Sequence, residues 1–143
     1  MEAMYSPPTE TDIDMLARMW VRIAGLVKDH FGVSSTNTVE YLGWVQRLID
    51  ETAVEDSFEV NQSLGCVFGM VLVDHVDGLD WCAVIDDEGR DLCLRYRESP
   101  LSVFPLDMIL NRREKKEVFD LTELFLETKR RVEQLVLQTQ RVN

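Results

Sequence analysis

The sequence predicts an α+β fold with three N-terminal helices, a small antiparallel β-meander of about three strands, and two C-terminal helices. Apolar residues recur at helical spacing before Gly78, and two short β-type runs then flank a turn at Asp86–Arg90. At 143 residues the chain is expected to form a single domain over residues 1–143, with residues 1–9 as a flexible tail.

Two amphipathic helices are expected in the first third of the chain. The first is capped by Thr11 and stops at Gly32, and a capping box of Asn37 with Glu40 opens the second. Their apolar stripes define the buried faces, which are Met15, Met19, Ile23 and Leu26 in the first and Tyr41, Val45, Leu48 and Ile49 in the second.

The run Leu64–Val73 is apolar on every side, which is typical of a buried element. Its length favours a central helix, although periodicity alone leaves a buried strand open. Gly65 and Gly69 would share one face of that helix, and each costs about 1 kcal/mol relative to alanine. We therefore expect another element to pack closely across this face.

The pattern changes to short strands after Gly78. The expected strands are Trp81–Ile85, Leu92–Tyr96 and Leu101–Phe104. Gly89 is placed at the positive-φ position of the turn between the first two. A short helix is expected from Pro105 through Leu110, because proline suits a first helical turn. A last helix is capped by Asp120 with Glu123, and its inward residues are Leu121, Phe125, Val132 and Leu135.

The three cysteines do not predict a disulfide framework. A turn of two or four residues would place Cys82 opposite Arg95 and Cys93 opposite Val84, which makes the cysteines diagonal neighbours roughly 7–8 Å apart. A three-residue turn would point them to opposite faces. Neither register bridges them, and Cys66 is expected to be an inert buried thiol.

Charge is distributed unevenly along the chain. The net charge is −11, with 19 acids against 7 bases in residues 1–100 and 7 acids against 8 bases in residues 101–143. Such a field repels nucleic acid and anionic membranes and favours basic partners, although acidity also serves solubility. No signal peptide or membrane-spanning run is recognised, so a cytoplasmic location is expected.

No catalytic residue, metal site or cofactor is predicted. Paired carboxylates at the hairpin turn could serve acid–base chemistry or bind a divalent cation. However, the calcium-loop pattern with its terminal glutamate is absent, and aspartate-rich turns are common because they hydrogen-bond locally. Asp74-His75-Val76-Asp77 lacks the second histidine that a tight metal site needs. The basic residues near the C-terminus alternate with acids and have no aromatic platform for nucleic acid.

Three motifs occur in order along the chain: Leu64-Gly-x-x-Phe-Gly69, Asp86-x-x-Gly-Arg-Asp91 and Val103-Phe-Pro-Leu-x-Met-Ile109. Together they resemble a bacterial domain-of-unknown-function family over residues 38 to 137. The resemblance brings no catalytic residues. It implies a context, because small acidic proteins of this kind are similar to the immunity proteins that neutralise bacterial toxins, including those delivered by type VI secretion.

The leading hypothesis is an immunity protein that occludes a toxin domain with a basic surface. Its expected contact residues are Asp86, Asp87, Glu88, Asp91, Asp74, Asp77 and Trp81. The C-terminal helices are expected to act as scaffold. Two alternatives stay open: a small carboxylate- or metal-dependent enzyme, and a homo-oligomeric regulatory module with Trp20 and Trp44 at an interface.

Overall fold

The computed structural model describes residues 2–142, with the side chains of residues 2–140. It confirms the α+β class. The elements are β1 (Met4–Ser6), α1 (Glu10–Phe31), α2 (Val39–Asp50), α3 (Phe58–His75), β2 (Leu79–Asp86), β3 (Gly89–Tyr96), β4 (Ser102–Val103), α4 (Pro105–Glu114) and α5 (Leu121–Val142). None of the helices within the described residues is long and apolar enough to cross a membrane.

The expected order of elements is wrong at the N-terminus, where a strand precedes the helices. Residues 4–6, expected to belong to a flexible tail, form β1 and pair antiparallel with β2. The antiparallel sheet therefore has four strands, in the order β1-β2-β3-β4. A three-residue strand that pairs with residues some eighty positions later carries no local pattern, so periodicity alone does not reveal it.

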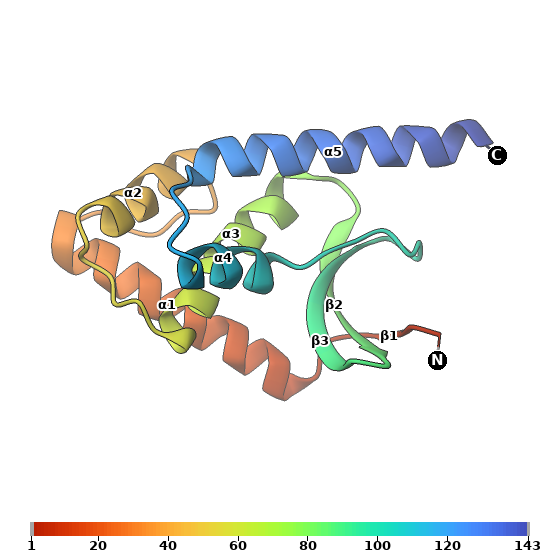
Figure 1. Ribbon diagram of the computed structural model, residues 1–143, viewed down its shortest axis with the longest axis horizontal. Coiled ribbons are helices and arrows are strands. Elements are labelled where there is room, and N and C mark those ends of the chain that lie inside the picture. Colours follow the sequence, from red (N-terminus) through yellow and green to blue (C-terminus); the bar gives the residue numbers. More distant parts are fainter. Residues whose placement is uncertain (1, 143) are drawn as a thin grey trace.

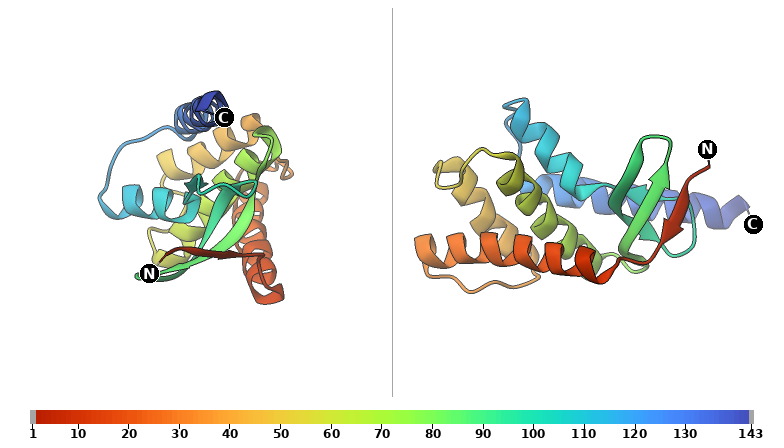
Figure 2. Two further views of the ribbon diagram at one scale, coloured as in Figure 1. Left: turned by 90° about the vertical axis from the view of Figure 1, so that its right-hand side faces the viewer. Right: turned by 90° about the horizontal axis from the view of Figure 1, so that it is seen from below.

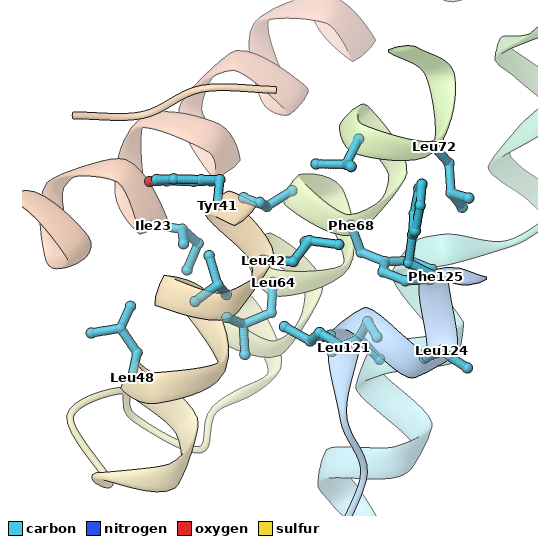
Figure 3. Packing of buried hydrophobic residues seen from close by; sticks show 14 of the residues in the cluster. Ile23, Tyr41, Leu42, Leu48, Leu64, Phe68, Leu72, Leu121, Leu124 and Phe125 are labelled. Carbon is cyan, nitrogen blue, oxygen red and sulfur yellow. The ribbon is translucent and has the colours of Figure 1, made fainter. Parts of the chain in front are cut away.

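Helix α3 is the centre of the molecule, as the apolar run predicts. In Figures 1 and 2 the other helices surround it and the sheet closes one end. Figure 3 shows the core that results, in which large side chains from α1, α2, α3 and α5 meet. Those fully buried include Ile23, Tyr41, Leu42, Leu64, Phe68, Leu72, Leu121 and Phe125.

The two glycines of α3 allow the close packing that the sequence predicts. A β-carbon on Gly65 would lie 2.5 Å from the carbonyl oxygen of Pro105 and 2.7 Å from Cα of Leu106. One on Gly69 would lie 2.8 Å from both the Pro105 ring and the Trp81 indole. Helix α4 and strand β2 therefore approach α3 at distances that only glycine permits.

Helix α1 begins two residues earlier than expected. Its N-cap is Thr9 and not Thr11: the Thr9 hydroxyl accepts from the Asp12 N–H at 3.1 Å, and the Asp12 carboxylate accepts from the Thr9 N–H at 2.8 Å. This is a capping box with aspartate in the place of the usual glutamate. Gly32 ends the helix with φ of 72°, as predicted.

The other two predicted caps have different outcomes. The box of Asn37 with Glu40 is wrong, because the N-cap of α2 is Thr38, whose hydroxyl bonds to that of Thr36 and makes no cap bond. Before α5, however, the Asp120 carboxylate accepts from the Glu123 N–H at 2.8 Å, as expected for a cap.

The register of the β2–β3 hairpin also differs from the prediction. Asp86 pairs with Gly89, so the turn consists of Asp87 and Glu88, one position earlier than a two-residue turn that contains Gly89, and Cys82 lies directly opposite Cys93. Gly89 has the expected positive φ, 116°, but it is the first residue of β3 and not part of the turn. The Asp86 carboxylate stabilises this turn by accepting from the Glu88 N–H at 2.9 Å.

Candidate functional site

The densest group of acids in the sequence lies at the end of the β2–β3 hairpin. We call its four acids, Asp86, Asp87, Glu88 and Asp91, the acidic tip. Three of them are exposed, and Asp86 is half-buried because its carboxylate holds the turn. The structure therefore brings together the four hairpin residues that the sequence predicted as partner contacts.

A partly buried ion pair fixes this tip to the helical body. The Arg90 guanidinium donates to both carboxylate oxygens of Asp12, at 3.0 and 2.5 Å. The Asp12 side chain is 7% exposed and that of Arg90 is 41% exposed. The Arg90 hydrogen bond, followed by those of Thr9, lowers the pKa of Asp12 to about 2 against the opposing effect of burial. Because Arg90 is paired with Asp12, its charge does not offset the acids of the tip.

The negative surface extends from the tip to the start of α4. Helix α4 contacts β3, and partial burial followed by the negative charge of Asp91 raises the pKa of Asp107 above its usual value. Sequence reasoning missed Asp107, although it lies within the Val103–Ile109 motif used for the family resemblance.

The remaining predicted contacts lie elsewhere. Asp74 and Asp77 are exposed at the opposite end of the hairpin from the tip. The length of β2 separates them from the acidic tip by about 26 Å, at roughly 3.3 Å for each of its residues. The seven predicted contacts therefore do not form one surface.

Trp81 lies on the inner face of the sheet. Its indole packs against Gly69, and the indole nitrogen is buried without a hydrogen-bond partner among the described residues. The side chain is half-buried, and its predicted role in partner binding remains a prediction.

Exposed apolar side chains lie next to the acidic tip. Met4 of β1 and Ile85 of β2 are cross-strand partners, 63% and 38% exposed. Ile13 is exposed on the first turn of α1, beside the Asp12 that binds the hairpin. Charge beside exposed apolar area is typical of a protein contact surface. We call Met4, Ile13 and Ile85 the apolar rim. The sequence does not predict it, because Met4 reaches this place only through the pairing of β1 with β2.

A groove of about 770 Å³ separates α5 from the segment 101–104. Its apolar lining includes Leu101, Val103, Phe104, Met108, Leu124, Val132 and Leu135. Arg112, Arg130 and Arg131 also line it, with Glu127 as the single acid. Figure 1 shows that the C-terminal half of α5 extends beyond the helical body. This α5 groove is the basic counterpart of the acidic tip.

The described residues contain no group of three or more histidine, cysteine or acidic side chains placed to hold a metal ion. Both histidines have contacts with nearby residues. His30 Nε2 lies 3.4 Å from the Glu51 carboxylate, and His75 Nδ1 lies 2.8 Å from the carbonyl oxygen of Val71 within its own helix.

Comparison with known proteins gives a family and a fold. A family model described as "Domain of unknown function (DUF3806)" matches residues 42–125. This agrees with the expected likeness to a domain-of-unknown-function family. No curated protein matches the chain. A crystal structure from Bacteroides thetaiotaomicron VPI-5482, at 1.50 Å resolution, is similar in fold, with a TM-score of 0.81 at 16% identity. The match covers 90% of this chain and 47% of the other, so the chain spans about half the length of that protein.

Proposed function

Because the chain belongs to the DUF3806 family, whose description states no activity, we propose from its own surface that it is a protein-binding module whose contact surface is the acidic tip. The observation that carries this proposal is the anchored, exposed set of acids beside an apolar rim. A preorganised surface of this kind loses little conformational entropy on binding. The partner it fits has a basic patch with apolar residues beside it.

The charge of the tip acts mainly on the rate of encounter. Three exposed carboxylates lie at the turn or directly after it, and the adjacent Arg90 is paired with Asp12. Opposite charges steer two proteins together and raise the association rate at low salt. The exposed Met4 and Ile85 would supply the apolar contact that slows dissociation.

Within this class we propose an immunity protein that neutralises a bacterial toxin, of the type VI secretion kind, by covering a basic surface on the toxin domain. This function is supported by the small size of the chain, its strong acidity and its anchored acidic tip. An inhibitor needs a stable scaffold and a surface complementary to its target. Such a protein acts in the cytoplasm of the cell it protects.

The test is binding to the product of the adjacent gene in the same operon, followed by association kinetics. The tip variant D87N/E88Q/D91N keeps Asp86, whose carboxylate holds the turn. The matched control is D74N/D77N, which neutralises acids at the other end of the hairpin. We expect the tip variant to associate about tenfold more slowly at low salt and to lose most of its salt dependence. The control should retain the wild-type rate.

Equal association rates for both variants would refute the tip as the contact surface. Absence of binding to the adjacent gene product would refute the immunity function. Urea unfolding midpoints of both variants, which are expected to match the wild type, show that the comparison concerns folded proteins.

A homo-oligomeric module is the second candidate, and the opposite charges of the α5 groove and the acidic tip favour it. The tip of one copy would then bind the groove of another. Sedimentation across a dilution series tests this arrangement, with R130E/R131E expected to shift the protein to monomer. A wild-type monomer at every concentration would exclude it.

A further inference from the structure

Two free thiols face each other across the outer side of the sheet. Cys82 of β2 and Cys93 of β3 are direct register partners, and neither forms a disulfide in the structure. They form a small buried cluster with Val84, and Tyr5 and Phe104 pack against it. Cys93 is fully buried, whereas Cys82 is 8% exposed.

The spacing of opposite residues suits a disulfide. Directly opposite residues of an antiparallel pair have Cα atoms about 4.5–5.5 Å apart, within the ~4.4–6.8 Å that a disulfide accepts. Their Cβ atoms lie about 4.5–5.5 Å apart, against the ~3.5–4.5 Å of a relaxed bridge. The strands must therefore draw together slightly when the bond forms, which makes the bridge easier to reduce.

The two thiols differ in access. Cys82 lines a surface pocket of about 620 Å³, together with Tyr5, Ser6, Asp80, Arg95 and Arg97 among others. With two arginines and one aspartate, the lining of this pocket has a net positive charge, which attracts an anionic reagent. Cys93 does not line this pocket, and burial followed by the neighbouring Cys82 raises the pKa of its thiol to about 11.

We propose that Cys82 and Cys93 form a thiol–disulfide exchange site for low-molecular-weight disulfides, with Cys82 as the attacking thiol and Cys93 as the resolving thiol. These roles follow from solvent access, because Cys82 lines the pocket and Cys93 does not. This site is independent of the partner-binding function proposed above.

The exchange proceeds in two balanced steps. The Cys82 sulfur loses its proton, attacks one sulfur of the reagent disulfide and releases the other half as a thiol, which leaves a mixed disulfide on Cys82. The Cys93 sulfur then loses its proton and attacks the Cys82 sulfur, which releases the second half as a thiol. Two protein thiols are oxidised to one disulfide, and one reagent disulfide is reduced to two thiols.

Oxidation would also loosen β1. The Cys82 thiol donates to the carbonyl oxygen of Ser6 at 3.2 Å, and a disulfide has no S–H to donate. The remaining side-chain support includes Tyr5, over whose ring the Arg95 guanidinium lies at 3.9 Å. We expect the amides of Met4–Ser6 to exchange faster in the oxidised protein than in the reduced protein.

The test uses the full chain and glutathione disulfide as the reagent, with acid quenching and peptide mass spectrometry. The wild type is expected to give a peptide pair joined through Cys82 and Cys93, which dithiothreitol separates. C93S is expected to accumulate the mixed disulfide on Cys82. C82S should leave Cys93 unmodified, and C66S, the control, should behave as the wild type.

Cys66 provides an internal comparison that needs no variant. It is fully buried, and burial raises the pKa of its thiol to about 12. Its modification in the wild type is expected to be at least about tenfold slower than that of Cys82. A stable glutathione adduct on wild-type Cys82 without the internal bridge would overturn the proposal. Modification of Cys66 as fast as Cys82 would overturn it too, because the reaction would then report unfolded chain.

Discussion

The ion pair between Asp12 and Arg90 gives the sharpest prediction about stability, since it joins α1 to the hairpin that carries the acidic tip. Replacing Asp12 with asparagine removes the charge and keeps an oxygen that can accept from the Thr9 N–H. The variant therefore isolates the ion pair from the helix cap.

The expected magnitude follows from the pKa of Asp12. A decrease from 3.8 to about 2 corresponds to roughly 2 kcal/mol of stability at neutral pH. Solvent screens the pair, because the Arg90 side chain is 41% exposed, so we expect about 1 kcal/mol for D12N. The folded-state pKa is depressed, so this contribution is present above a pH of about 4 and is lost as the pH falls through about 2.

The assay is urea unfolding of wild type and D12N at several pH values from neutral down to about 2. The difference between their free energies of unfolding should be largest at neutral pH and should shrink as the acid limit is approached. D14N, which removes an exposed acid from the same helical turn, is the control and should differ little from the wild type. If D12N lowered the free energy of unfolding by the same amount at every pH, the electrostatic explanation would be refuted.

Further predictions concern the core and are measured by urea unfolding. Gly65→Ala should cost about 3 kcal/mol or more, because its β-carbon would meet the backbone of Pro105 and Leu106. Gly25→Ala, with nothing within 4 Å of the added carbon, should instead stabilise the protein by up to about 1 kcal/mol. Tyr41→Phe should be neutral or stabilising, because the buried hydroxyl has no partner among the described residues. A clear loss in Tyr41→Phe, or a tolerated Gly65→Ala, would contradict these arguments.

Local patterns in the sequence were sufficient to predict the helices. Periodicity located α1, α2 and α5, the length of the apolar run located α3, and the glycine pair Gly65 and Gly69 correctly indicated close packing against α3. The acids of the tip could also be identified, because they are adjacent in the chain. Each of these features depends on residues within a few positions of one another.

Features that depend on distant residues could not be predicted. Strand β1 exists only through its pairing with β2, and Asp12 meets Arg90 across a separation of 78 positions. The predicted hairpin register is wrong for a different reason. Gly89 was placed inside the turn, whereas its positive φ occurs at the first position of β3. That shift brought Cys82 opposite Cys93.

The placement of the acidic tip depends on residues outside the region that matches the family. The match covers residues 42–125, which include the hairpin and its acids but neither β1 nor α1. Met4 and Ile13 nevertheless belong to the apolar rim, and Asp12 anchors the tip through Arg90. The N-terminal segment therefore sets the position of a surface that the family region carries. If the tip binds a partner as proposed, a substitution at exposed Met4 should change partner fit, whereas α1 also supplies buried core residues such as Ile23.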